Sequence, residues 1–141
     1  MKVVELMRTH IVTVGPDSTM GEVVDMMDLY QLTSIPVVDS QGKPLGVIDD
    51  RAVSDAVFQS SSLALRSDVD SSIVAAVRSK NVSSLMETPP VVIDEDDEVE
   101  IAIRLLKDND LMRIPVTTDG RVTGTLSRID VCQAILEGQI P

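Results

Sequence analysis

The chain has 141 residues, of which 43% are hydrophobic, and this is enough for one compact globular unit or two half-units. A formal net charge of −11 argues against nucleic acid or an anionic membrane as the main partner. With one Tyr, one Phe and no Trp, the chain offers no stacking platform for single-stranded nucleic acid, and its core is expected to be aliphatic.

The cysteine content and the N-terminal sequence favour the cytoplasm. The single cysteine, Cys132, cannot form an internal disulfide and is expected to be a small buried residue of a helix. Glu5 and the lack of a long apolar run near the N-terminus argue against a signal peptide. No segment approaches the roughly 20 apolar residues that span a bilayer, so we expect a cytoplasmic protein without direct membrane insertion.

The chain repeats itself, because residues 3–58 can be aligned with residues 82–136. The matched residues are Leu6-Met7 with Leu85-Met86, Ile35-Pro36-Val37 with Ile114-Pro115-Val116, and Gly42 and Gly46 with Gly120 and Gly124. A repeat of this length indicates two small domains that pack together, since each is too small to bury much core alone. We place the first domain at 1–58, a linker at 59–81 and the second domain at 82–141, and expect function at the surface that the domains share.

The first copy is predicted to run strand, helix, strand, strand, helix. The strands are expected at 12–14, 35–38 and 45–48, and the closing helix at 51–58. The first helix has one apolar stripe, made of Met20, Val23, Val24 and Met27, and its predicted cap is Asp17-Ser18. In the linker, a turn is expected at Ser60-Ser61-Ser62 and some helix over Ser72–Lys80.

The second copy is predicted to have the same order of elements. Its strands are expected at 91–93, 114–117 and 122–126, and its closing helix at 129–136. The stripe of its first helix is Val99, Ala102, Ile103 and Leu106, with a predicted cap at Asp96-Asp97. We interpret the acidic run 94–98 as a solvated helix start that the helix dipole favours, with divalent-cation sensing as the alternative.

This ordered set of features resembles the cystathionine-β-synthase (CBS) domain, present here as a tandem pair. The resemblance rests on the two Leu-Met pairs, the two Ile-Pro-Val runs, the hairpin glycines and the segment 124–130. That segment fits the family ending Gly-apolar-apolar-Ser/Thr-x-x-Asp, with Thr125 as an imperfect fit. The resemblance covers almost the whole chain and implies an α/β (α+β) fold, with two pseudo-symmetric repeats packed through their sheets.

The resemblance implies a regulatory module and not an enzyme. Such pairs hold AMP, ADP, ATP or S-adenosylmethionine in clefts between the repeats, form disc-like homodimers and act on a protein partner or on their own assembly. They need no cofactor. The sequence shows no paired acid and base, no nucleophile–His arrangement and no phosphate-cradling glycine loop, and a lone His is poor support for a metal. A ligand-independent dimerisation or interaction module is the alternative.

The resemblance also places the adenosine site. Asp130 is expected to accept hydrogen bonds from the ribose hydroxyls, Ser127 to contact ribose or phosphate, and Arg113 and Arg128 to meet phosphates. The base contacts are expected from His10-Ile11-Val12 and Thr33-Ser34-Ile35-Pro36 of the first copy. Plainer interpretations stay open: a helix N-cap for Asp130, a strand end for Ser127, a surface charge for Arg113 and a loop residue for His10.

The corresponding cleft of the first copy departs from the motif. Asp49 stands where Ser or Thr is expected, and Ala52 stands where the ribose-binding Asp is expected. Ala52 offers no acceptor, and Asp49 would place negative charge near a phosphate. We predict that this cleft is empty, weak or used for something other than a ribonucleotide.

Overall fold

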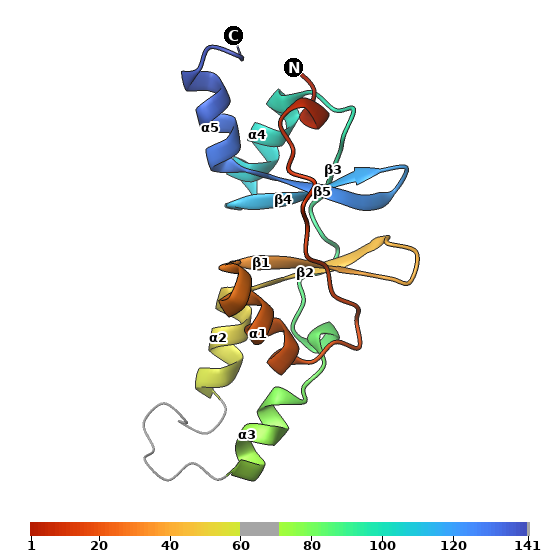
Figure 1. Ribbon diagram of the computed structural model, residues 1–141, viewed down its shortest axis with the longest axis vertical. Helices are drawn as coiled ribbons and strands as arrows, with labels where there is room; N and C mark the ends of the chain where they lie inside the picture. The colour runs from red at the N-terminus through yellow and green to blue at the C-terminus, as the bar shows by residue number, and fades with distance from the viewer. Residues whose placement is uncertain (60–70, 141) are drawn as a thin grey trace. The chain divides into compact units, whose positions relative to one another are not determined.

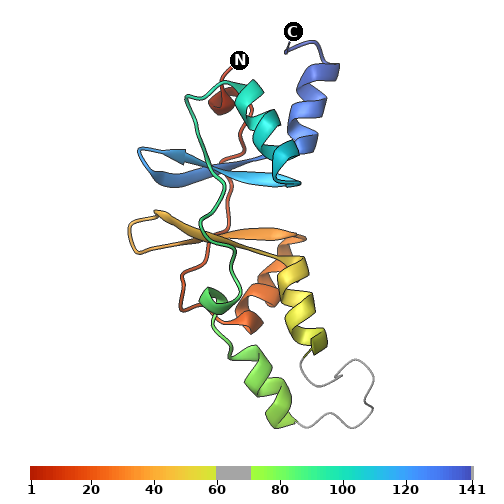
Figure 2. The ribbon, with the colours of Figure 1, turned by 180° about the vertical axis from the view of Figure 1, so that it is seen from behind.

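The computed structural model describes residues 1–59 and 71–140, which divide into two compact units. Unit 1 consists of Met1–Val12, Gln41–Lys43 and Val91–Pro141, and unit 2 consists of Thr13–Ser40 and Pro44–Pro90. Within each unit, helices cover one face of a small sheet (Figure 1), as the view from behind also shows (Figure 2). The predicted turn at Ser60–Ser62 lies outside the described residues.

Unit 2 is built on an antiparallel hairpin. Strand β1 (Ser34–Val38) pairs with β2 (Pro44–Asp49), and this register places Ser34 opposite Asp49. Helices α1 (Met20–Tyr30) and α2 (Asp50–Gln59) pack on the hairpin, and α3 (Ser71–Arg78) packs on α1. A 3-10 turn, η3 (Val82–Ser84), follows. The helical periodicity expected in the linker is thus confirmed by α3.

Unit 1 has the same plan around a three-stranded sheet. Strand β3 (Ile93–Asp94) runs parallel to β4 (Arg113–Thr118), which pairs with β5 (Arg121–Ser127) as a hairpin. A 3-10 turn, η1 (Val3–Glu5), begins the unit, and α4 (Val99–Asp108) and α5 (Arg128–Leu136) pack together.

The core of unit 1 is aliphatic, as the composition predicted. Its buried members are Val3, Ile93, Val99, Ala102, Leu106, Ile114, Val116, Leu126, Val131, Ala134 and Ile140. Three of the four residues predicted for the stripe of α4 are in this cluster, and the fourth, Ile103, packs against it. Within the part of the chain that the structure describes, no helix is long and apolar enough to cross a membrane.

The first predicted strand of each copy is shorter than expected. Over residues 12–14, only Val14 forms a bridge, which is parallel and joins it to Val37. In the second copy, β3 begins at Ile93 and not at residue 91. In both places the chain has just passed from one compact unit to the other, so the residues before the pairing cannot extend the same sheet.

The predicted helix caps were wrong in position. The N-cap of α1 is Thr19, whose Oγ1 accepts a hydrogen bond from Glu22 N while Glu22 Oε2 accepts one from Thr19 N. The N-cap of α4 is Glu98, which makes no capping bond with its side chain. Asp97 closes the preceding turn instead, because its Oδ2 accepts from Asp94 N at 3.2 Å.

The expectation that Cys132 is buried was also wrong. Cys132 is exposed, although α5 packs on the sheet. The buried residues of α5 are Val131 and Ala134, so the side that faces the core follows their i, i+3 spacing. Position 132 lies about 100° further round the helix from Val131 and points away from that side.

Each unit also contains the segment that leads into the other repeat. In unit 1, Arg8 N donates to Thr125 O at 2.9 Å and Thr125 N donates to Arg8 O at 2.9 Å. In unit 2, Glu87 N donates to Val47 O at 2.8 Å and Val47 N donates to Glu87 O at 3.1 Å. The same reciprocal pair of main-chain bonds therefore attaches a distant segment to β5 in one unit and to β2 in the other.

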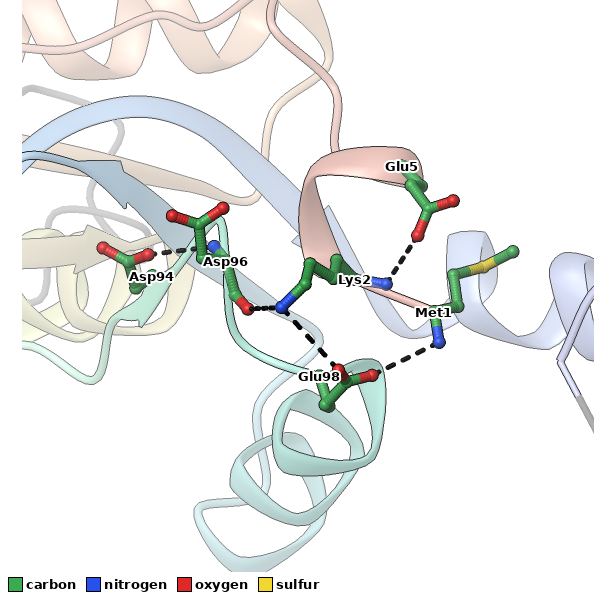
Figure 3. Close-up of polar contacts among 6 residues, drawn as sticks. All are labelled: Met1, Lys2, Glu5, Asp94, Asp96 and Glu98. Atoms are coloured by element: carbon green, nitrogen blue, oxygen red, sulfur yellow. Dashed lines mark hydrogen bonds and ion pairs between the residues drawn. The ribbon is translucent and has the colours of Figure 1, made fainter.

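Side-chain contacts hold the start of the N-terminal segment as well (Figure 3). Lys2 Nζ donates to Asp96 O at 2.8 Å and lies 3.8 Å from Glu98 Oε1. The acidic run before α4 is therefore bound by the ammonium group of Lys2, which lies more than ninety residues away in the sequence. Together with the buried Val3, these contacts make the segment an integral part of unit 1.

Two glycines make room for these attached segments. A Cβ on Gly124 would lie 2.6 Å from Arg8 O, and a Cβ on Gly46 would lie 2.7 Å from Glu87 O. A carbon and an oxygen atom at this distance overlap sterically, so any residue with a Cβ would push the segment away from the strand. The two glycines occupy matching positions in the repeat, which explains why both copies contain one there.

Gly124→Ala and Gly46→Ala are each expected to lower the free energy of unfolding by about 1–3 kcal/mol, because overpacking forces the backbone to shift. Urea denaturation followed by circular dichroism measures the change. The matched control is Gly15→Ala, whose Cβ would meet no atom within 4 Å. The explanation fails if all three variants are equally stable.

Candidate functional site

The predicted site residues Ser127 and Asp130 meet where β5 ends and α5 begins. Ser127 is the N-cap of α5, and its Oγ accepts a hydrogen bond from Asp130 N at 3.1 Å. Asp130 Oδ2 in turn accepts one from Ser127 N at 3.3 Å, which completes a capping box. The N-cap is therefore Ser127, and Asp130 is the third residue of the helix. The Ser127 hydroxyl still has a proton to donate.

The carboxylate of Asp130 also binds a residue from the N-terminal segment. Arg8 Nε lies 3.0 Å and Arg8 Nη2 lies 2.9 Å from Asp130 Oδ1. The side chain of Asp130 is 10% exposed, whereas that of Arg8 is 66% exposed. The guanidinium thus lies on the solvent side of a largely buried carboxylate.

The pKa of Asp130 lies below its ordinary value. Burial by itself raises the pKa, but the hydrogen bonds from Arg8 and Ser127, together with the positive charge of Arg8, outweigh the burial. Asp130 is therefore a charged hydrogen-bond acceptor at neutral pH. A charged carboxylate is the form that binds hydroxyl donors best.

Arg113 lies beside this pair. It is the first residue of β4 and is directly opposite Ser127 in the antiparallel register. Directly opposed side chains lie on the same face of a sheet, with Cβ atoms roughly 5 Å apart. Arg113 is partly exposed, and no hydrogen bond or ion pair holds its guanidinium among residues 1–59 and 71–140. It is thus a cation next to the Ser127 hydroxyl and without a protein partner in that set.

Arg128, the second phosphate candidate, has other partners. Its Nη2 donates to Leu106 O at 2.8 Å and its Nε donates to Leu111 O. These carbonyl groups lie in and just after the last turn of α4, where a cation is favoured by the helix dipole. The guanidinium of Arg128 therefore ties α5 to the end of α4, and its contact with a phosphate stays a prediction.

The remaining predicted residues are divided between the two units. His10, Ile11 and Val12 follow Arg8 in unit 1, where His10 is exposed and the other two are partly buried. Thr33, Ser34 and Pro36 belong to unit 2; Thr33 is exposed and Pro36 is buried within β1. Unit 1 therefore brings together Ser127, Asp130 and Arg113, and the base contacts remain predictions.

The equivalent corner of unit 2 has different chemistry. Asp49 takes the place of Ser127, and its Oδ1 accepts a hydrogen bond from Ala52 N at 2.7 Å at the start of α2. Ala52 replaces Asp130, and Glu87, by its pairing with Val47, replaces Arg8. The position of Asp130 therefore lacks a carboxylate and the position of Arg8 lacks a cation, while Asp49 and Glu87 add two negative charges.

Sequence reasoning missed Arg8. The repeat contained a usable signal, since Leu6-Met7-Arg8-Thr9 matches Leu85-Met86-Glu87-Thr88 with the charge reversed. The same alignment matches Asp130 with Ala52. The unit that has the carboxylate Asp130 also has the cation Arg8, and the unit that has Ala52 in its place has the anion Glu87. A direct ion pair between the two positions would produce this pattern.

These groups can bind but show no catalytic arrangement. A carboxylate, a hydroxyl and guanidinium groups suit a ligand that offers hydroxyl donors and an anion. Among the described residues, no group of three or more His, Cys, Asp or Glu side chains is placed to hold a metal ion.

The two similar units, each with helices on a small sheet and a capped helix start after its hairpin, define a tandem α/β repeat protein. The profile of the family described as "CBS domain" matches residues 3–59 and 82–137. The chain thus belongs to the CBS domain family and contains two copies of the domain.

Known relatives agree with this assignment. Inosine-5′-monophosphate dehydrogenase of Methanocaldococcus jannaschii is 28% identical over 131 residues, which are 90% of this chain but 22% of that enzyme. The chain CBSX2, described in a crystal structure "in complex with AMP", is 23% identical with a TM-score of 0.78, and the match covers 99% of this chain and 98% of the other. The CBS domain pair of MJ0100, "in complex with 5-methylthioadenosine and S-adenosyl-L-methionine", is 18% identical with a TM-score of 0.76, and the coverage is 99% and 98%.

These curated relatives are longer than this chain. The chain spans 22%, 32% and 60% of three curated relatives that it matches in Methanocaldococcus jannaschii and Methanopyrus kandleri. The solved structures share the fold with this chain, and their ligands belong to those proteins.

Arg8→Gln is expected to raise the pKa of Asp130, because it removes the charge and the hydrogen bonds that oppose the effect of burial. In the wild type the ion pair contributes fully to stability above the ordinary pKa of about 4. That contribution is lost as the pH falls through the lower pKa of the folded state. Titration of the Asp130 carboxyl by NMR measures its pKa in the wild type and in Arg8→Gln. Arg104→Gln on the exposed face of α4 is the control, and an equal Asp130 pKa in all three proteins would contradict the role given to Arg8.

Proposed function

We propose that the chain is a regulatory module that binds an adenosine compound, either AMP, ADP, ATP or S-adenosylmethionine, through the Ser127–Asp130 corner of unit 1. Binding would change the module's assembly or its action on a partner. Any such change requires that the ligand binds one conformation more tightly than another. The module would not be an enzyme and would need no cofactor.

The observation that carries this proposal is the grouping of Asp130, Ser127 and Arg113 at one corner. Asp130 is charged and largely buried, so it suits the paired hydroxyl donors of a ribose. Ser127 and Arg113 are direct neighbours across the hairpin and suit a phosphate. The AMP in CBSX2 and the adenosine compounds in MJ0100 support an adenosine ligand for a protein of this fold.

The base would be held by the predicted apolar and main-chain groups. We propose the base contacts as the resemblance implies them, from His10, Ile11 and Val12 and from Thr33, Ser34 and Pro36. Arg128 is a weaker phosphate candidate than Arg113 because its guanidinium already binds two main-chain carbonyl groups.

A thermal-shift panel tests the ligand, since a compound that binds the folded state raises the melting temperature by mass action. The panel comprises AMP, ADP, ATP with and without magnesium, and S-adenosylmethionine, with GTP as the control. Asp130→Asn is expected to weaken binding by about 5- to 100-fold, because a hydrogen-bonded charge is lost. Asp108→Asn, at an exposed position of α4, is the matched control. Binding that is unchanged in Asp130→Asn would show that the ribose is bound elsewhere.

A ligand-independent homodimer or interaction module is the second candidate, and exposed apolar side chains favour it. Leu29 is 72% exposed, Phe58 is 61% exposed and Leu136 is 87% exposed. Contiguous patches of such side chains mark contacts between proteins, and Leu29 and Phe58 lie on the neighbouring helices α1 and α2. Sedimentation velocity with and without AMP separates the two candidates. A homodimer that AMP alters supports the sensor; a homodimer that no compound of the panel alters, with no thermal shift, supports the interaction module.

A further inference from the structure

Arg8 occupies most of the free acceptor capacity of Asp130. A carboxylate has about four acceptor sites on its two oxygens. Arg8 Nε and Nη2 both bind Oδ1, at 3.0 and 2.9 Å, and Ser127 N binds Oδ2 at 3.3 Å. About one site is therefore left. A ribose presents two neighbouring hydroxyl donors, so Asp130 cannot accept both while Arg8 keeps both of its contacts.

The group that gives way is the Arg8 side chain. Ser127 N is held by the capping box of α5, so withdrawing it would disturb the start of the helix. The Arg8 side chain is 66% exposed, so water solvates its guanidinium when it leaves Asp130, and the ribose hydroxyls take its place at the carboxylate. The main chain of Arg8 is fixed by its two bonds to Thr125. A released guanidinium therefore stays tethered two residues along β5 from Ser127.

We infer that Arg8 exchanges Asp130 for a phosphate of the ligand, so that the site selects phosphorylated adenosine compounds over adenosine and S-adenosylmethionine. This inference rests on the proposed function. A guanidinium next to a newly bound ribose has lost its anionic partner, and a phosphate replaces that partner with matching, two-pronged geometry. In S-adenosylmethionine a positively charged sulfonium stands next to the ribose where AMP has its phosphate, and like charges repel; its carboxylate lies three carbon atoms further from the ribose.

The equivalent corner of unit 2 supports the link between the ribose acceptor and the exchangeable cation. There the positions of Arg8 and Asp130 hold Glu87 and Ala52, so neither the ribose acceptor nor the exchangeable cation is present. A phosphate at that corner would face Glu87 and Asp49. The exchange is therefore possible in one of the two copies.

The test compares the affinities of AMP and adenosine by titration calorimetry in the wild type and in Arg8→Gln. AMP binding is expected to weaken about tenfold, because a charged hydrogen-bond partner of the phosphate is lost. Adenosine binding is expected to tighten about two- to fivefold, because nothing competes for Asp130. Arg8→Gln keeps the main-chain bonds to Thr125, and circular dichroism verifies its fold. Arg104→Gln removes the same charge from exposed α4 and is expected to change neither affinity.

In Arg8→Gln the affinities for AMP and for adenosine are expected to change in opposite directions, which separates this proposal from its alternatives. Equal weakening of both ligands would mean that Arg8 only orients Asp130, and it would overturn the exchange. Unchanged affinities in Arg8→Gln would overturn it as well. If AMP binds the wild type and Asp130→Asn abolishes that binding, the proposed function stands whatever Arg8→Gln does. If no adenosine compound binds the wild type, the proposed function and the exchange both fail.

Discussion

The structure depends on a close approach of two main chains that only glycine permits. At Gly124 the absent side chain lets Arg8 O reach β5, and at Gly46 it lets Glu87 O reach β2. Each approach is closed by two reciprocal main-chain hydrogen bonds. The segment leading into each repeat thereby becomes part of the unit formed by the other repeat. Each half therefore needs a segment from elsewhere in the chain to complete it, as expected of domains too small to bury a full core.

The same main-chain attachment determines which side chains meet at the end of each hairpin. In unit 1 it brings Arg8 to Asp130, and in unit 2 it pairs Glu87 with Val47, two residues before Asp49. The backbone contacts are alike, yet the charges are opposite. The two units thus have matching main-chain pairs but different side chains, because main-chain pairing does not depend on the type of side chain at the paired position.

Folding and the proposed ligand binding draw on the same groups at the start of α5. Ser127 and Asp130 satisfy main-chain N–H groups that a helix start leaves without partners. That arrangement also holds a charged carboxylate in a fixed, mostly buried position beside a free hydroxyl proton and the Arg113 guanidinium. The plain interpretation as helix capping and the functional interpretation therefore do not exclude each other, since the capping box orients the acceptor that a ligand would use.

The sequence by itself determined the local features: the repeat, the order of helices and strands, the aliphatic stripe of α4 and the motif from Gly124 to Asp130. The helices, strands and stripe follow from periodicity and turn chemistry, which act between near neighbours. The repeat follows from aligning the two halves of the chain, and the motif follows from the resemblance to the CBS domain. Only the tertiary structure decided that Cys132 is exposed, that Arg128 binds the end of α4, and that Arg8 meets Asp130. Arg8 and Asp130 are 122 positions apart, and their contact exists because the chain carries its first segment onto its last hairpin. Periodicity and turn chemistry do not specify that path, because it is set by long-range packing and by the space that a glycine leaves; the charge reversal between Arg8 and Glu87 is a trace of it in the sequence.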